Sequence, residues 1–134
     1  MTRPELRLDG NVLRANIAAV QRRIAPSELM IVVKDDAYGH GLPWAVETAI
    51  ESGVTWIGSF DVRSAIDVRR VAGGGARIFA WVTSTDAEID EALLHDVDLG
   101  IGTADYLDRV IARATAIEVR ARVHLKTDSG LQDR

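Results

Sequence analysis

Short apolar runs alternate with longer amphipathic segments along the whole chain. The runs are rich in β-branched residues, and their centres lie roughly 20–26 residues apart, which suits one strand plus a crossover helix. The pattern therefore predicts consecutive βα units. The predicted strands cover residues 29–33, 55–59, 77–82, 97–101 and 118–125.

The segments between these runs carry helix boundaries. Asp9 is a candidate N-cap for a helix over residues 11–24, and Pro26 ends that helix. Pro43 suits the first turn of a second helix that ends near Gly53. The later helices begin at Asp61 (closed by the glycines at 73–75), at Thr85 or Asp86, and at Thr103. The apolar stripe of the first helix consists of Val12, Ala15, Ile17, Ala19, Val20 and Ile24.

Alternating βα units imply a parallel sheet with helices outside it. Two architectures satisfy that rule: an open doubly wound sheet and a closed (β/α)8 barrel. A barrel needs eight strands and typically about 250 residues, so five strands would fill only part of one. Periodicity alone favours the open sheet, which five strands would complete. No G-x-G-x-x-G turn follows a strand, so a dinucleotide site has no support.

Composition excludes several classes of protein. The chain has 134 residues, a net charge of -4 and no cysteine, which excludes disulfide scaffolds and Cys-rich zinc modules. The acidic balance gives no basis for a nucleic-acid partner. No apolar run reaches the roughly 20 residues of a membrane span, and the N-terminus lacks the apolar stretch of a signal peptide. We therefore expect no membrane association and a cytoplasmic protein.

The most informative stretch is Met-Ile-Val-Val-Lys-Asp-Asp-Ala-Tyr-Gly-His-Gly at residues 30–41. It delivers Lys34 at the carboxyl end of a predicted strand, the edge where parallel α/β folds build their sites. A neutral amine there can form a Schiff base with an aldehyde, and pyridoxal phosphate (PLP) is the commonest aldehyde cofactor to use one. The phenol of Tyr38 can donate to a phosphate oxygen, while Gly39 and Gly41 let the backbone bend around a ligand. From spacing alone, an exposed lysine that closes a strand is the commoner explanation.

The string at residues 32–41 resembles the PLP-lysine motif of alanine racemases, the fold-type III PLP enzymes. In that family the lysine matching Lys34 binds the cofactor and is one of two catalytic bases, and the tyrosine matching Tyr38 contacts the phosphate. The usual motif has a small residue at the position of Asp35. On an extended strand Asp35 would point away from Lys34, so we expect the substitution to leave the site intact.

This resemblance implies an isomerase that interconverts L- and D-alanine, supplies D-alanine for peptidoglycan and acts as a homodimer. It also implies the family's fold, a partial (β/α)8 TIM-type barrel of about five βα units with parallel strands. Residues 1–134 would then form the N-terminal portion of the barrel domain, without the family's mostly β C-terminal domain.

Two further segments extend the resemblance. Residues 77–81 are similar to the family's third strand, where Trp81 matches a bulky apolar residue beside the cofactor ring; a plain core aromatic is an equally good explanation. Residues 123–131 are similar to a later strand and turn. There the lysine matching Lys126 is carbamylated in many members, and its anion holds an arginine that hydrogen-bonds the cofactor. The alternative for Lys126 is a strand-end lysine paired with Asp128.

The resemblance breaks near the end of the sequence. The family's arginine follows the lysine by seven residues, whereas position 133 is Asp133 and Arg134 lies eight residues on, so Arg134 is a substrate-binding candidate in a shifted register. The second base of the family, a tyrosine of the C-terminal domain, has no counterpart. Tyr106 lies in a predicted outer helix, and no paired His or carboxylate spacing suggests a metal site. The remaining candidates that we expect to be structural or exposed are His40, His95 and His124.

We therefore expect a truncated racemase without independent activity. Two other classes stay open: a non-catalytic PLP-binding protein, and a small α/β domain with a vestigial PLP lysine. Open sheet edges would also favour self-association or molten behaviour.

Overall fold

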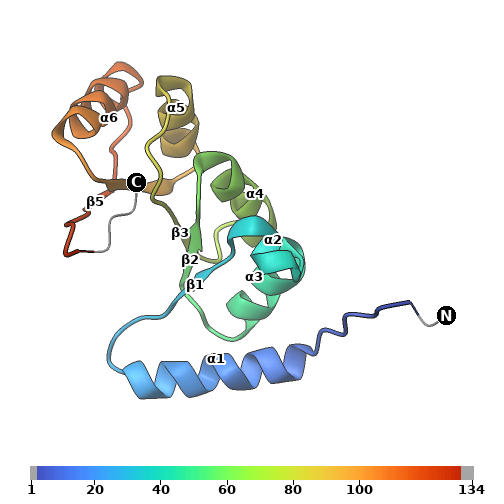
Figure 1. Cartoon of the computed structure of the whole chain (residues 1–134). Coiled ribbons are helices and arrows are strands. Elements are labelled where there is room, and N and C mark those ends of the chain that lie inside the picture. Colours follow the sequence, from blue (N-terminus) through green and yellow to red (C-terminus); the bar gives the residue numbers. More distant parts are fainter. Residues whose placement is uncertain (1–2, 131–134) are drawn as a thin grey trace.

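The computed structural model describes residues 3–130, which form one five-stranded parallel sheet with helices outside it (Figure 1). The strands lie in the order β1-β2-β3-β4-β5, so each is hydrogen-bonded to its neighbours in sequence. Four of the five predicted strands match within two residues. The observed strands are β1 (Met30–Val32), β2 (Trp56–Ser59), β3 (Arg77–Ala80), β4 (Val97–Ile101) and β5 (Val123–Leu125).

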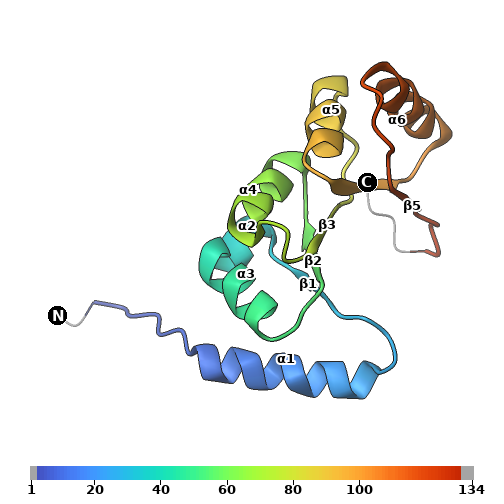
Figure 2. The same cartoon turned by 180° about the vertical axis from the view of Figure 1, so that it is seen from behind.

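The strand order decides between the two architectures. A doubly wound sheet reverses its strand order at a switch point, and this sheet has no reversal. Right-handed crossovers then place every connecting helix on the same face of the sheet. Figures 1 and 2 show α3 to α6 following the outside of the curved sheet. The partial barrel is confirmed, and the open sheet favoured by periodicity is wrong.

The predicted helix starts are confirmed, and four of the five rest on a side-chain cap. The helix predicted at Pro43 begins at Leu42 without a side-chain cap. Asp9 accepts from the main-chain N–H of Asn11 and Val12, and Asp61 accepts from that of Ser64. Thr85 forms a capping box with Glu88. Thr103 caps the last helix by accepting from the main-chain N–H of Tyr106. The helices outside the site loop are α1 (Gly10–Ile24), α3 (Leu42–Glu51), α4 (Val62–Ala72), α5 (Asp86–Leu94) and α6 (Ala104–Ala116).

One sequence prediction needs correction. The predicted strand over residues 118–125 is shorter, because Glu118 has φ 56 and the N–H of Val119 bonds the oxygen of Ala114, so these residues end α6 instead. The apolar stripe of α1 is mostly uncovered: Ile17 is its one buried residue, and Val12 and Val20 are exposed.

The hydrophobic core lies between the sheet and its helices. Along each strand, alternate side chains point outward to the helices and inward to the concave face. Ile57, Ile78 and Leu99 form the outward layer and are fully buried. Among the described residues β1 pairs only with β2 and β5 only with β4, so both are edges and the concave face is open. No helix over residues 3–130 is long and apolar enough to cross a membrane.

Candidate active site

Lys34 lies where β1 meets a left-handed turn. Strand β1 ends at Val32, and Lys34 begins α2 (Lys34–Gly39), whose residues 35–38 all have φ between 53 and 55. For residues other than glycine this conformation costs about 1–2 kcal/mol each. The expectation that Asp35 continues an extended strand is therefore wrong, and its exposed side chain lies on the turn.

Hydrogen bonds hold this turn in place. The N–H of Ala37 donates to the oxygen of Val33 at 3.0 Å, and the N–H of Gly41 donates to that of Asp36 at 2.9 Å. The Asp36 carboxylate also accepts from the N–H of Leu42 at 2.7 Å. A strained segment that the surroundings fix in this way is typical of functional sites. The strain directly follows the predicted cofactor lysine, which supports a functional assignment of this loop.

Aromatic side chains surround the Lys34 amine. Its Nζ lies 5.9 Å from the ring centroid of Tyr38 and 6.0 Å from that of Phe60. Tyr38 is 58% exposed, so its phenol is free to donate to a ligand. The ring of Phe60 meets that of Trp81 edge-to-face, with centroids 6.5 Å apart. Sequence reasoning missed Phe60, although its position directly after β2 puts it at the same edge as Lys34.

Two glycines make room for Trp81 on the concave face. A Cβ at Gly58 would lie 2.9 Å from Met30 Sδ and 3.1 Å from Trp81 Cζ3. A Cβ at Gly100 would lie 2.9 Å from Phe79 Cζ and 3.0 Å from Trp81 Cα. Trp81 therefore lies half-buried over the inner face of the sheet and outside the core beneath the helices.

Lys126 lies at the carboxyl end of β5. Its Nζ donates to the main-chain oxygen of Trp81 at 3.0 Å. The carboxylate of Asp128 instead accepts from the N–H of Gly130 at 2.8 Å. Within residues 3–130, Lys126 is thus bonded to a main-chain oxygen and not to Asp128. Arg134, the substrate-binding candidate, lies outside the described residues.

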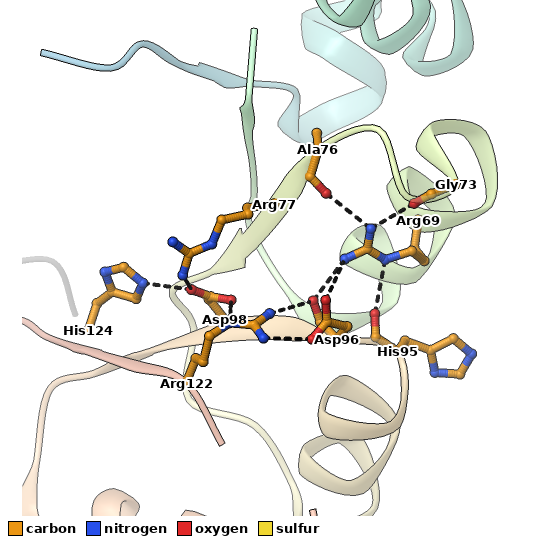
Figure 3. A network of polar contacts seen from close by, with 9 residues as sticks. All are labelled: Arg69, Gly73, Ala76, Arg77, His95, Asp96, Asp98, Arg122 and His124. Atoms are coloured by element: carbon orange, nitrogen blue, oxygen red, sulfur yellow. Dashed lines mark hydrogen bonds and ion pairs between the residues drawn. The ribbon is translucent and has the colours of Figure 1, made fainter. Parts of the chain in front are cut away.

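A charged layer occupies the amino-terminal half of the concave face (Figure 3). Its centre is Asp98, which is fully buried. Arg77 donates to Asp98 Oδ2 at 2.7 Å, Arg122 donates to Oδ1 at 2.8 Å, and the ring of His124 lies 2.9 Å from Oδ2. This layer ties β3, β4 and β5 together. A hydrogen bond from Arg122 also lowers the pKa of the neighbouring Asp96 carboxyl.

The other candidate side chains have structural surroundings. His40 Nδ1 lies 2.8 Å from the oxygen of Ala37, and His95 Nδ1 lies 2.8 Å from that of Glu91. Tyr106 is only 2% exposed, beneath α6, so its phenol does not reach the concave face. In the part of the chain that the structure describes, no cluster of three His, Asp or Glu side chains could hold a metal ion.

A cavity of about 510 Å³ lies behind the lysine loop, between α1 and the β1–α3 unit. Ile17, Val33, Ala37 and His40 are among its lining residues, whereas Lys34, Tyr38 and Phe60 are not. Its lining is mainly apolar, with a few polar residues such as Arg7, Asp9 and Asn16. The chemistry-bearing residues therefore converge on the open concave face and not in this cavity.

The residues at the strand ends fit a phosphorylated aromatic aldehyde. Lys34 supplies an amine, Tyr38 supplies an exposed phenolic donor, and Phe60 and Trp81 supply flat apolar walls. Such a ligand requires an amine that can bind its carbonyl carbon, a hydrogen-bond donor for its anionic group and aromatic side chains beside its ring.

Comparison with known proteins agrees with this arrangement. Residues 8–134 match the family described as alanine racemase, N-terminal domain. The chain belongs to this family. It is 39% identical to the alanine racemase of Thermobifida fusca over 127 residues, which cover 95% of the chain and 34% of that relative. It is also 39% identical to the alanine racemase of Beutenbergia cavernae over 124 residues, or 92% of the chain and 32% of that relative. The chain thus spans about a third of the length of these curated relatives.

Solved structures of the family share the fold. The alanine racemase from Streptomyces coelicolor A3(2) superposes with a TM-score of 0.86 and 35% identity, covering 92% of this chain and 33% of that one. A histidine racemase from Leuconostoc mesenteroides superposes with a TM-score of 0.85 at 21% identity, a likeness that shows the fold alone. Racemases with different named substrates therefore share this part of the fold. The resemblance to the alanine racemase family is confirmed.

Proposed function

We propose that this chain forms the cofactor-binding part of a PLP-dependent amino-acid racemase of the alanine racemase type. Residues 1–134 would be the N-terminal portion of its barrel domain. The observation that carries the proposal is Lys34 at the carboxyl edge of β1, on a strained turn and between two aromatic rings. Family membership over residues 8–134 supports the same assignment.

Each site residue has a role in this proposal. Lys34 Nζ holds the aldehyde carbon of PLP, the Tyr38 phenol donates to the phosphate, and Trp81 packs beside the ring. Lys126, once carbamylated, presents an anion at the carboxyl end of β5. When bound, PLP supplies an electron sink that acidifies the Cα–H of an amino acid. Lys34 then moves a proton at Cα on one face.

Inversion at Cα also needs a proton donor on the opposite face. Among residues 3–130, the phenol of Tyr106 does not serve, because it is buried beneath α6. We expect the second base to come from groups outside the described residues. We accordingly expect the 134-residue chain alone to bind PLP without racemising amino acids.

The substrate is a small amino acid in this proposal, with alanine first because the curated relatives are alanine racemases. The fold itself does not select alanine, since a histidine racemase shares it. Action in the cytoplasm, as a homodimer that supplies D-alanine for peptidoglycan, belongs to the same proposal.

A second candidate is a PLP-binding protein without catalysis. The observation that favours it is that Tyr106 is buried beneath α6, which leaves Lys34 as the one base that this proposal assigns. Both candidates use Lys34 in the same way, so binding supports either, and they differ only in turnover.

Equilibrium dialysis of PLP against the full chain, with Lys34→Ala and Lys126→Ala as variants, tests the proposal. We expect the wild-type chain and Lys126→Ala to retain PLP, and Lys34→Ala to lose it. Equal retention by Lys34→Ala would overturn the role of Lys34. A parallel assay for interconversion of L- and D-alanine should show none, and measurable turnover would refute the expected dependence on a second base.

A further inference from the structure

Phe60 lies in the same row of side chains as Lys34 and Trp81. Val32 is aligned with Gly58, and Gly58 is aligned with Phe79. Lys34, Phe60 and Trp81 lie two residues further on, just beyond the ends of β1, β2 and β3. The Lys34 amine lies 6.0 Å from the ring centroid of Phe60, whose ring contacts that of Trp81. The register thus brings a lysine and two aromatic side chains to one place on the concave face.

Two rings bracket the Lys34 amine at nearly equal distances, 5.9 Å for Tyr38 and 6.0 Å for Phe60. An ammonium within about 6 Å of an aromatic centroid is attracted to the ring face. The two rings are carried by different kinds of backbone, because Tyr38 lies on the left-handed turn whereas Phe60 directly follows strand β2. The N–H of Val82 also donates to the oxygen of Phe60 at 3.2 Å.

Phe60 keeps 45% of its surface exposed although it lies next to a buried strand. Its contact with Trp81 is edge-to-face, with an interplanar angle of 85°, so the two rings form a corner. Such a corner offers a flat ligand one ring face to stack on and a second wall at right angles. The exposed ring is therefore available to a planar group held at Lys34.

We propose that Phe60 is a positioning residue for Lys34. Its ring holds the lysine amine over the concave face and forms one side of the space in which a planar aldehyde binds. The inference rests on the proposed function and deepens it. It also distinguishes the two lysines of the chain, because the Lys126 amine is instead hydrogen-bonded to the main-chain oxygen of Trp81.

The test measures two quantities on the full chain with PLP as the probe. The first is the dissociation constant from an absorbance titration. The second is the share of label on Lys34 relative to Lys126 after borohydride reduction and peptide mapping. The variants are Phe60→Ala, Phe60→Leu and Phe60→Tyr, with Leu94→Ala as a control at an exposed apolar residue of α5.

We expect Phe60→Ala to weaken PLP binding about tenfold and to shift label from Lys34 toward Lys126. Phe60→Leu keeps most of the apolar volume but lacks the ring, so it should behave like Phe60→Ala even if the alanine variant folds poorly. Phe60→Tyr should restore wild-type binding and labelling, and Leu94→Ala should match the wild type. A merely structural role would leave the label distribution unchanged.

Two results would overturn the inference, and they are distinguishable. If the wild type binds PLP at Lys34 and Phe60→Leu does so equally well, the role of Phe60 is refuted while the proposed function stands. If the wild type itself takes up no PLP, the proposed function fails, and the role of Phe60 fails with it.

Discussion

The Lys126 amine donates to the main-chain oxygen of Trp81 at 3.0 Å, so a side chain from β5 reaches across β4 to the end of β3. The methylene chain crosses directly over Gly102, where a Cβ would lie 3.3 Å from Lys126 Cε. This contact fixes the amine at the carboxyl edge of the sheet, on the same face as Trp81.

Lys126 should take up carbon dioxide as a carbamate. The amine nitrogen bonds the carbon of CO₂ and loses a proton, and isotopically labelled bicarbonate makes the product visible by carbon NMR. We expect a carbamate signal in the wild type and in Lys34→Ala, and its loss in Lys126→Met. A signal that persists in Lys126→Met would show that the modified amine is elsewhere.

Gly100→Ala should destabilise the chain by about 1–3 kcal/mol, because a Cβ there meets main-chain and ring atoms of Trp81 and Phe79 that have little room to move. Gly74→Ala is the matched control: a Cβ there meets nothing within 4 Å, so the change should be neutral or stabilise by up to about 1 kcal/mol. Urea unfolding followed by tryptophan fluorescence measures both. Equal effects of the two substitutions would contradict the close approach of Trp81 to β4.

Asp98→Asn should lower the free energy of unfolding by about 3 kcal/mol, because it leaves Arg77 and Arg122 without their buried anion. This predicted loss lies at the low end of the range measured for broken buried ion pairs, because both arginine side chains are about half exposed. Asp67→Asn is the control, because its pair with Arg70 lies on the surface and should contribute less than about 1 kcal/mol. Chemical denaturation measures the free energy of unfolding of both variants. If Asp98→Asn loses no more of it than Asp67→Asn does, the charged layer does not stabilise the fold as proposed.

Acid should weaken the fold. The Thr85 N–H donates to the Glu88 carboxylate at 2.8 Å and holds the pKa of Glu88 below its ordinary value of 4.5. Arg122 similarly holds the pKa of Asp96 below 3.8. Because the folded pKa values are lower than the unfolded ones, this stabilisation is complete above about pH 5 and is lost as the pH falls through the folded values.

Urea titrations at a series of pH values from neutral to strongly acidic measure this effect. The free energy of unfolding should fall with the pH below about 5, and Glu88→Gln should reduce the slope. Identical slopes for the wild type and Glu88→Gln would show that Glu88 is not linked to folding.

Local signals explain which parts of the fold follow from sequence. Asp9, Asp61 and Thr103 bond main-chain groups only two or three residues away, so composition and spacing were enough to locate these helix starts. The left-handed turn carried no such signal, because residues 35–38 contain no glycine that would mark their positive φ values.

The remaining site features depend on strand register. Phe60 joins Lys34, and Asp98 joins Arg77 and His124, only once β1 to β5 are aligned. A single sequence gives each strand but not the pairing that brings these side chains into rows. The choice between an open sheet and a barrel likewise depends on strand order, which periodicity leaves undetermined.

Lys34 is the residue proposed to bind PLP, and because the chain has only two lysines the site of binding can be measured directly. When the chain is mixed with PLP, the amine nitrogen bonds the aldehyde carbon with loss of water, and borohydride then adds hydride to the resulting C=N bond. Mass spectrometry of the digested protein locates the phosphopyridoxyl group. We predict that it lies on Lys34, with little on Lys126 or the N-terminus. An even distribution over all three amines would contradict the account.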